Sequence, residues 1–230
     1  MLLTTASLSV RLFDCGSRDA IDGIELGKIF GAKEVHFFEC NPDSAIVCRK
    51  NIADAESGST PLKMIFNEVA LGDRVGETSF FAIDPEKTVT PHPGGNVGAS
   101  SLLKASLSYK KERYVQREIT VPMITLGKYF ENGQIPNLIW MDLQGADVMA
   151  LTGCGVKLSE VDLIHVEVGF RPMYVGQALF GDVHDLLNRH FKLAHIDLGR
   201  WPKLLWLYRL FRLGPWVSNA IYVNKSKFPD

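Results

Sequence analysis

Three acidic residues, Asp14, Glu39 and Asp142, each come at the end of a short apolar run with the composition of a β-strand. In an open α/β sheet, ligands bind beyond the carboxyl ends of the strands. Polar side chains that recur at this position are hard to explain as core packing. One such residue would mean little, but the set of three predicts a ligand site at one edge of a sheet.

The turn after the first run joins Asp14 to Gly16 in the sequence Asp-Cys-Gly-Ser-Arg. Gly16 has no side chain, so a ligand can approach the backbone closely there. Arg18 occupies the place of the second glycine in the G-x-G-x-x-G pattern of dinucleotide-binding folds. In that pattern the glycine leaves room for a pyrophosphate to bind at the helix N-terminus. S-adenosylmethionine carries no phosphate but has a sulfonium cation, which a carboxylate at Asp14 suits. Taken alone, the turn fits an ordinary strand-to-helix connection equally well.

Glu39 follows Asp14 by 25 positions, a spacing at which a strand-end carboxylate can accept both ribose hydroxyls of a nucleoside. The strand position and the spacing both favour this role, and we expect the side chain to serve only the ligand. The alternative is a solvated acid beside the helix that begins at Pro42, for which Asn41 is the expected cap.

A reacting hydroxyl group needs a general base within hydrogen-bond reach. Asp142 and Glu167 are the candidates, because both end strands that face the same crevice. His165 lies one residue inside its strand, where core histidines are common. His92 is a further candidate if the glycine-rich loop that carries it folds over the site. For Glu167, a structural hydrogen-bonding role is as well supported as a catalytic one.

The segment from His92 to Ser101 is rich in glycine and unlike the rest of the chain. Its glycines allow movement, and Ser100 and Ser101 offer hydroxyls to a polar substrate, so we expect a substrate-binding lid that includes His92. The alternative is a disordered surface loop. Arg171 and Tyr174 follow a core strand at the same edge, and their position alone makes them candidates for substrate contact.

The elements that must position these residues alternate between strand and helix patterns, which predicts an α/β fold. The predicted strands are Ser9–Cys15, Glu34–Glu39, Leu62–Leu71 (running into a turn), Gly76–Ile83, Arg117–Ile124, Leu138–Leu143, Asp162–Val168, Phe191–Asp197 and Asn219–Val223. The predicted helices are Ala20–Phe30, Pro42–Ile52, Thr125–Phe130, Ala146–Gly153 and Val183–His190. Near-continuous apolar strands indicate a mostly parallel central sheet with helices on both faces. The last two strands lack an ordinary crossover, so we expect an antiparallel terminal hairpin. A single domain spans residues 1–230, with an excursion at about 72–135.

Five segments together resemble the FkbM family of S-adenosylmethionine-dependent methyltransferases, which have a Rossmann-like fold. They are FDCGSRDAIDG (13–23), FFECNPD (37–43), NEVALGDRVGE (67–77), IWMDLQGADVMALTG (139–153) and IHVEV (164–168). They occur in the family's order over roughly residues 10–225, and MDLQGADVMALTG is the most specific. Gln144 stands where the family commonly has Glu, and Arg18 where a small residue or Asn is frequent.

This resemblance implies transfer of a methyl group to oxygen, commonly on a sugar or another small hydroxylated metabolite. It implies that Asp14, Gly16 and Ser17 border the methionine moiety, and that Glu39 binds the ribose. It also implies that Asp142 lies near the methionine amino group. The full set of expected cofactor-binding residues is Asp14, Gly16, Ser17, Glu39, Asn41, Asn67, Glu68, Ala70 and Asp142, of which Asn67, Glu68 and Ala70 are expected near adenine.

The composition of the 230 residues bounds the choice of partners. With 25 basic and 26 acidic residues the formal charge is −1, so the generally basic footprint of a nucleic-acid-binding protein is missing. The four cysteines form no C-x-x-C pair and no zinc-site spacing, so no metal is expected and a reducing compartment is favoured. Residues 1–10 lack the features of a signal peptide, which makes the cytoplasm the expected location.

A basic segment at 199–216, GRWPKLLWLYRLFRLGPW, contains four Lys or Arg residues and no acid. Over Lys203–Leu213, a helical projection puts Arg209 and Arg212 on one side and the apolar side chains largely opposite. Such a helix either lies on an anionic membrane surface or packs on its own domain or on a second subunit. The short length favours packing over membrane contact.

Two other functions compete with O-methylation. A nicotinamide-dependent oxidoreductase would share the fold, but the missing G-x-G-x-x-G pattern counts against it. A catalytically silent binding module of the same fold is the second, because fold does not guarantee function. N-methylation also stays open, since the cofactor site would look the same.

Overall fold

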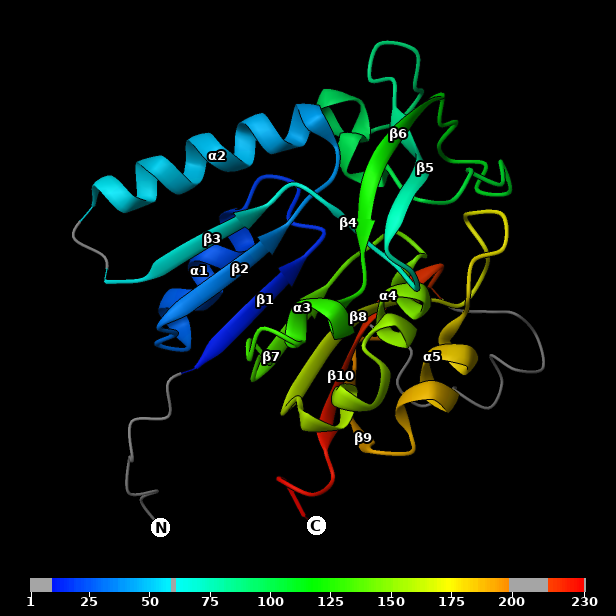
Figure 1. The fold of residues 1–230 in the computed structure, drawn as a ribbon. Coiled ribbons are helices and arrows are strands. Elements are labelled where there is room, and N and C mark those ends of the chain that lie inside the picture. Colours follow the sequence, from blue (N-terminus) through cyan, green and yellow to red (C-terminus); the bar gives the residue numbers. More distant parts are fainter. Residues whose placement is uncertain (1–9, 59–60, 199–214, 230) are drawn as a thin grey trace.

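The computed structural model describes residues 10–58, 61–198 and 215–229. Its main sheet has seven strands in the order β3-β2-β1-β7-β8-β10-β9 (Figure 1). In that order they are β3 (Lys63–Asn67), β2 (Glu34–Phe38), β1 (Arg11–Cys15), β7 (Leu138–Met141), β8 (Leu163–Gly169), β10 (Val217–Asn224) and β9 (Phe191–Ile196). Neighbouring strands from β3 to β8 are parallel, whereas β10 is antiparallel to β8 and β9. The mostly parallel sheet and the antiparallel terminal pair predicted from the sequence are confirmed.

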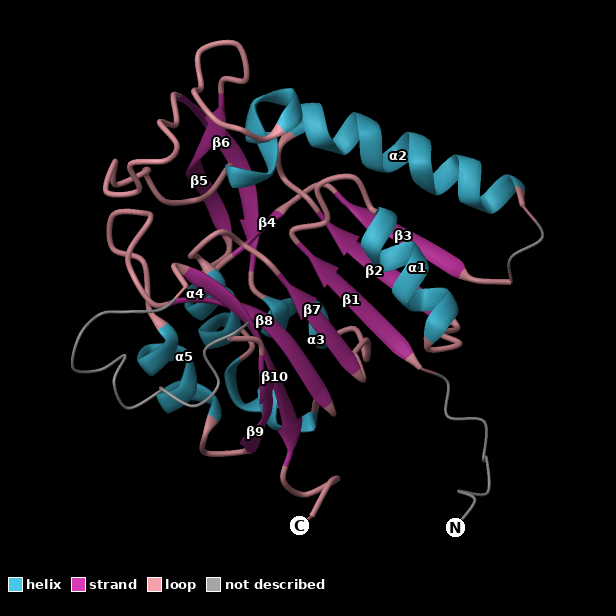
Figure 2. Cartoon of the chain, turned by 180° about the vertical axis from the view of Figure 1, so that it is seen from behind, coloured by secondary structure: helices cyan, strands magenta, loops and turns pink. Residues whose placement is uncertain are grey.

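Helices cover both faces of this sheet. On one face lie α1 (Ile21–Ile29) and α2 (Pro42–Ser57), which cover the half of the sheet that contains β1, β2 and β3 (Figure 2). On the other face lie α3 (Leu126–Phe130), α4 (Asp147–Gly153), the short η2 (Gly155–Glu160) and α5 (Phe180–Leu187). Successive side chains of β1 point to opposite faces of the sheet, which produces this division. Leu12 belongs to the hydrophobic cluster between the sheet and helices α1 and α2. Phe13 and Cys15 belong to the cluster between the sheet and α3, α4, η2 and α5.

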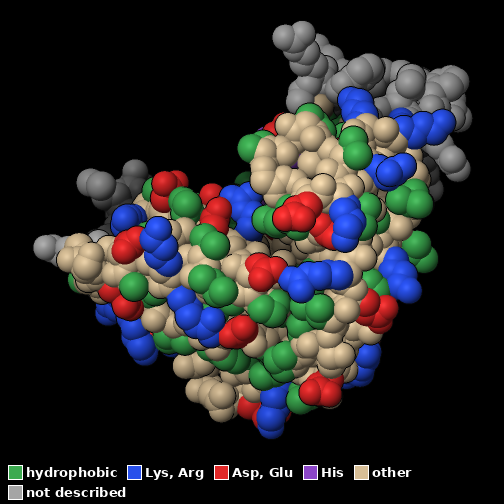
Figure 3. All heavy atoms as spheres, turned by 90° about the horizontal axis from the view of Figure 1, so that it is seen from above, with side chains coloured by type: hydrophobic (Ala, Val, Ile, Leu, Met, Phe, Trp, Pro, Cys, Tyr) green, Lys and Arg blue, Asp and Glu red, His purple; other side chains and the backbone are tan. Residues whose placement is uncertain are grey.

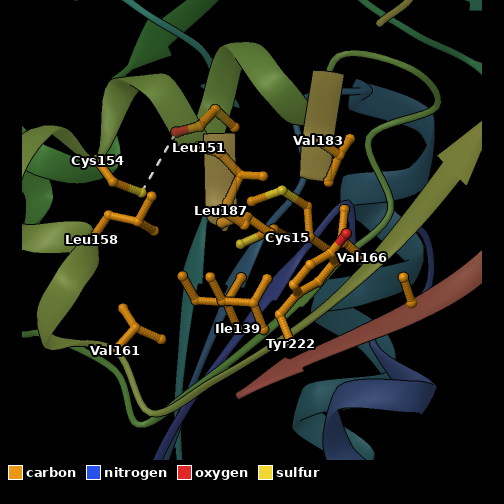
Figure 4. Packing of buried hydrophobic residues seen from close by; sticks show 14 of the residues in the cluster. Cys15, Ile139, Leu151, Cys154, Leu158, Val161, Val166, Val183, Leu187 and Tyr222 are labelled. Carbon is orange, nitrogen blue, oxygen red and sulfur yellow. Dashed lines mark hydrogen bonds between the residues drawn. The ribbon is translucent and has the colours of Figure 1, made fainter. Parts of the chain in front are cut away.

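The larger hydrophobic cluster joins α4 and α5 to the centre of the sheet. Leu151 and Leu187 come from the two helices and lie over Cys15, Ile139 and Tyr222 of the strands, all fully buried (Figure 4). Burial of side chains of this size contributes roughly 1.5–3 kcal/mol each. The cluster fixes β1 and β7 as rigid neighbours and thereby fixes the loops that follow them.

Helix α2 begins as predicted, because Asn41 accepts a hydrogen bond from the Asp43 main-chain N–H (3.1 Å) and Pro42 occupies the first turn. It ends at Ser57 instead of the predicted Ile52. The intervening residues include good helix formers, and the first helix-breaking residue is Gly58.

The predicted excursion forms a second, three-stranded sheet with the order β4-β6-β5. Its elements are β4 (Ala70–Leu71), β5 (Gly76–Ile83), η1 (Pro93–Ala99) and β6 (Gln116–Ile124). The chain leaves the main sheet after Asn67, whose main-chain oxygen accepts from Glu39 N (3.2 Å) and Val69 N (3.0 Å). Helix α3 lies within the predicted excursion but packs into the main core through Leu126 and Phe130.

Most of the basic segment at 199–216 lies outside the described residues, which resume at 215. In the described part of the chain, no helix combines the length and the apolar character needed to cross a bilayer. Basic and acidic side chains are interspersed on the face seen from above in Figure 3, with no large area of one sign.

Candidate active site

Two adjacent cavities, here called the wide arm and the narrow arm, lie at the carboxyl ends of β1, β2 and β7. The wide arm encloses about 360 Å³. The narrow arm encloses about 50 Å³, which is room for only a few water molecules. Gly16, Arg18, Gly98, Asp142 and Gln144 line both arms, so the arms meet between the β1–α1 turn, the end of β7 and η1.

The structure brings ten of the predicted site residues to these two arms, which is where the carboxyl ends of parallel strands would place them. The wide arm is lined by Asp14, Gly16, Ser17, His92, Asp142 and Glu167. The narrow arm is lined by Gly16, Glu39, Asn41, Ala70, Ser100 and Asp142.

The β1–α1 turn lies directly against the end of β7. Gly16 has a φ of 91°, and a Cβ atom there would stand 2.0 Å from the main-chain oxygen of Asp142. Ser17 is buried; its hydroxyl donates to Asp14 O (2.8 Å) and accepts from Phe38 N (3.2 Å). Ser17 therefore fixes the turn to β2, in addition to facing the wide arm.

Asp14 presents a buried carboxyl group to the cavity. Its side chain lies against Gly23 of α1, where a Cβ would stand 2.5 Å from Asp14 Oδ2. This oxygen has no hydrogen-bond partner among the described residues. Burial raises the pKa of Asp14 to about 7, and the nearby acids Asp22 and Glu39 act in the same direction. A buried carboxyl oxygen without a partner is costly, so Oδ2 marks a place where a cationic or hydrogen-bond-donating ligand is stabilised.

Glu39 ties two turns together. Its Oε2 accepts from Arg18 N (2.9 Å) and its Oε1 accepts from Asn41 N (2.7 Å). The expectation that this side chain serves only the ligand is therefore wrong, because the carboxylate also holds the β1–α1 turn and the start of α2. Each carboxylate oxygen has two lone pairs, so both oxygens can still accept from a ligand. Burial raises the pKa of Glu39.

The loop after β7 is held by its own side chains. Asp142 N donates to Cys15 O (2.9 Å), and its Oδ1 accepts from Gln144 Nε2 (2.7 Å). Asp147, which the sequence reasoning missed, accepts from Leu143 N (3.0 Å) and Gly145 N (3.2 Å). Burial raises the pKa of Asp147 to about 7, with Asp142 as a further cause. Burial also raises the pKa of Asp142, and the Gln144 hydrogen bond opposes this.

Glu167 lies near the end of β8, as predicted, and is paired with Asn219 of β10. It faces the wide arm. Burial and the nearby Asp142 and Asp147 raise the pKa of Glu167 well above its usual range. This shift favours the protonated side chain, which donates a hydrogen bond more readily than it removes a proton.

The far wall of the wide arm comes from η1 and residues 109–114. Glu112 is buried there and accepts from Thr90 Oγ1 (2.6 Å) and Asn96 Nδ2 (2.9 Å). Burial raises its pKa, but the hydrogen bonds from Thr90, Asn96 and Tyr114 outweigh burial and lower it overall. His92 Nε2 lies 3.7 Å from Glu112 Oε1. No sequence pattern pointed to Glu112, because it sits in an ordinary charged run.

Aromatic side chains complete the wide arm. Trp140 lies parallel to His165, with ring centroids 3.5 Å apart. Burial lowers the pKa of His165 to about 4, so the imidazole is neutral at physiological pH, as expected of a strand histidine. Trp216 contacts the Tyr109 ring at 4.9 Å, and the Arg171 guanidinium lies 5.3 Å from the Trp216 centroid.

Five predicted residues are not among the described residues that line either arm. They are Asn67, Glu68, Ser101, Arg171 and Tyr174. Asn67 Nδ2 donates to Phe37 O (3.1 Å), which ties β3 to β2. Glu68 is exposed and forms an ion pair with Arg49. Arg171 contacts Trp216, which lines the wide arm.

Ser101 and Tyr174 bind the loop after β7 rather than the cavity. Ser101 Oγ donates to Gln144 O (2.8 Å). Tyr174 Oη lies 2.8 Å from Gln144 Oε1 and 2.9 Å from Ala99 O. Both residues were expected to contact the methyl-acceptor substrate. In the structure the Ser101 hydroxyl instead lies against the Gln144 main chain, and the Tyr174 hydroxyl lies against Ala99 O and the Gln144 side chain.

No set of three or more His, Cys, Asp or Glu side chains in the described ranges is arranged to hold a metal ion. The four cysteines are all free and buried.

The topology and the cavity at the carboxyl ends of its strands define a Rossmann-like methyltransferase fold. The chain belongs to the FkbM methyltransferase family, since the family model of the methyltransferase FkbM domain matches residues 14–193.

Two known proteins illustrate the relationship. The chain is 25% identical over 199 residues to the 2-O-methyltransferase NoeI of Sinorhizobium fredii (strain NBRC 101917 / NGR234), a match covering 82% of this chain and 75% of NoeI. It superposes on the crystal structure of methyltransferase FkbM from Methylobacillus flagellatus KT with a TM-score of 0.54 and 12% identity. That match covers 96% of this chain but 46% of the other, so this chain spans less than half the length of the solved protein.

Proposed function

We propose that this chain is an S-adenosylmethionine-dependent methyltransferase that methylates a hydroxyl group of a sugar or small metabolite. The observation that carries the cofactor assignment is the buried carboxyl of Asp14, whose Oδ2 has no partner among the described residues and which lines the wide arm. A zwitterionic cofactor that carries a sulfonium and an ammonium brings one net positive charge to this place. A dinucleotide would instead bring a pyrophosphate beside Asp14, Asp22 and Glu39, which like-charge repulsion disfavours.

The residues of the two arms divide the cofactor between them. Glu39 at the end of β2 and Ala70 line the narrow arm, which suits the ribose and the adenine. Asp14 and Asp142 line the wide arm, which suits the methionine end. Val97, Gly98 and Ser100 of the η1 region also line the narrow arm, so this segment lies against the proposed nucleoside site.

When bound, the cofactor supplies an activated methyl group for in-line displacement by a nucleophile. The protein's contribution is then positioning, exclusion of water and removal of the nucleophile's proton. Asp142 and Glu167 are the predicted base candidates, but their raised pKa values make proton removal pH-dependent. His92, which faces the wide arm beside the hydrogen-bonded Glu112, is a third candidate.

Two observations support a hydroxylated acceptor. The relative NoeI is by its name a 2-O-methyltransferase. The wide arm combines the aromatic rings of Trp140, Tyr109 and Tyr114 with the carboxylate of Glu112, and such walls suit a ring that carries hydroxyl groups.

The test is methyl transfer from S-adenosylmethionine with a labelled methyl group to a panel of monosaccharides and their amino-sugar counterparts. Label on a hydroxyl oxygen supports the proposal, and label on nitrogen replaces O- by N-methylation. If the chain binds S-adenosylhomocysteine but no sugar in the panel becomes labelled, the result favours the silent binding module.

A further inference from the structure

The Gln144 side chain lies between Asp142 and Tyr174 and forms a hydrogen bond with each. Its Nε2 donates to Asp142 Oδ1 (2.7 Å), and its Oε1 accepts from Tyr174 Oη (2.8 Å). The same hydroxyl lies 2.9 Å from Ala99 O, at the end of η1. The Tyr174 hydroxyl has one proton and two acceptors within reach, so it donates either to Gln144 Oε1 or to Ala99 O. Tyr174 thus lies between the loop after β7 and the segment that covers the other side of the cavity.

The chemistry of the neighbours fixes the orientation of the amide. While Asp142 is ionised its carboxylate can only accept, so it faces the Nε2 donor, and Oε1 is left to face the Tyr174 hydroxyl. A flipped amide would place Oε1 against the Asp142 carboxylate.

The main chain imposes this arrangement. Gln144 has a φ of 51°, a conformation that residues with a side chain rarely adopt. It is held there by Ser101 Oγ, which donates to Gln144 O (2.8 Å), and by Asp147, which accepts from Leu143 N and Gly145 N. Strain that persists under so many constraints is typical of functional sites.

We propose that Gln144 is a positioning residue: its amide holds the Asp142 carboxylate in one orientation for the cofactor and links it through Tyr174 to η1. This inference rests on the proposed cofactor site. It predicts that cofactor binding and the ordering of η1 reinforce each other, although Tyr174 itself is not among the residues lining the cavity.

The surrounding charges make an amide and a carboxylate at position 144 differ in their effect on Asp142. Asp142 is faced by the acids Asp22 of α1, Asp147 of α4 and Glu167 of β8, and by one cation, Arg18 of the β1–α1 turn. A second carboxylate at 144 would put two acceptor oxygens at the present 2.7 Å separation. Such a pair is stable only while it shares a proton.

The first test is calorimetric titration of the Gln144→Glu variant with S-adenosylhomocysteine between about pH 5.5 and about pH 8. The affinity of the unmodified chain should rise with pH, because burial raises the pKa of both acids that face the cofactor, Asp14 and Asp142. The affinity of the variant should fall, by about tenfold across the range, as the carboxylate pair loses its shared proton. Gln134→Glu, at a partly exposed turn residue, is the matched control and should follow the unmodified chain. A Gln144→Glu profile that rises with pH would overturn the proposal.

The second test uses three variants. They are Tyr174→Phe, which removes only the hydroxyl, Gln144→Ala, and the double variant that combines the two substitutions. Both single variants should weaken binding, and the double variant should bind no more weakly than Gln144→Ala, because the two act through one connection. In the unmodified chain, the ligand should slow hydrogen exchange over residues 93–100, and Tyr174→Phe should abolish that slowing. Additive losses, or unchanged slowing in Tyr174→Phe, contradict the link.

The two proposals fail differently. If the folded, unmodified chain does not bind S-adenosylhomocysteine, the proposed function fails. If it binds and the Gln144 and Tyr174 variants behave like the unmodified chain, only the positioning role fails.

Discussion

A Cβ atom on Gly16 would stand 2.0 Å from the main-chain oxygen of Asp142, so the turn after β1 and the end of β7 are in backbone contact. Gly16 also has a φ of 91°, which disfavours any side chain. The two strand ends that supply Asp14 and Asp142 to the wide arm are therefore held against each other at a single glycine.

We expect Gly16→Ala to abolish measurable S-adenosylhomocysteine binding and to lower the free energy of unfolding by roughly 2–4 kcal/mol, through strain and displacement of Asp142. Calorimetry and denaturant titration measure the two effects. Gly133→Ala is the control, because Gly133 also has a positive φ (74°) but no atom lies within 4 Å of the place that its Cβ would take. Equal effects of the two substitutions would mean that the Gly16–Asp142 contact has no role beyond backbone strain.

Glu39→Gln should weaken S-adenosylhomocysteine binding by roughly 10- to 100-fold, because a charge-assisted hydrogen bond to the ribose contributes about 1.5–3 kcal/mol. It should also destabilise the fold slightly, since an amide NH₂ must then face Arg18 N or Asn41 N. Glu68→Gln is the matched control: Glu68 is exposed, pairs with Arg49 and does not line either arm. A loss of affinity in Glu68→Gln but not in Glu39→Gln would contradict the ribose assignment.

Asp14 should make the ligand-free protein less stable as the pH rises. Its folded-state pKa is about 7, above the value of about 3.9 in an unfolded chain, so the native state binds a proton that the unfolded state has released. Stability is therefore lost between about pH 4 and about pH 7, by at most about 4 kcal/mol. Asp14→Asn should remove this loss and stabilise the protein at pH 7, while it weakens cofactor binding.

Denaturant titrations of the Asp14→Asn variant at several pH values, compared with the exposed Asp54→Asn, measure this difference. A stability difference between Asp14→Asn and the unmodified chain that does not grow from about pH 4 to about pH 7 would show that the Asp14 carboxyl is not held in its neutral form.

The sequence predicted the sheet and the cavity edge well because both depend on local patterns. The apolar run at β7 is buried on both faces, as its lack of alternation implied, and Asp142 follows it directly. Parallel pairing then brings Asp14 and Asp142 together without any information beyond strand order. Element ends were less predictable: the strand that carries Glu167 was predicted to end at Val168, but β8 continues to Gly169, which pairs with Val217 of β10.

The far side of the cavity could not be predicted, because it depends on contacts between distant segments. Glu112 reaches the wide arm only because Thr90 and Asn96 hold it there. Ser101 and Tyr174 were expected to face the acceptor, but their hydroxyls bind Gln144, 43 and 30 positions away. No periodicity or short motif encodes such pairings.

The most direct test of the account is calorimetric titration of the purified chain with S-adenosylhomocysteine, with NAD as the control ligand. The account predicts saturable binding of one S-adenosylhomocysteine per chain and no binding of NAD. Binding of NAD in preference to S-adenosylhomocysteine, or binding of neither by a folded sample, would contradict it.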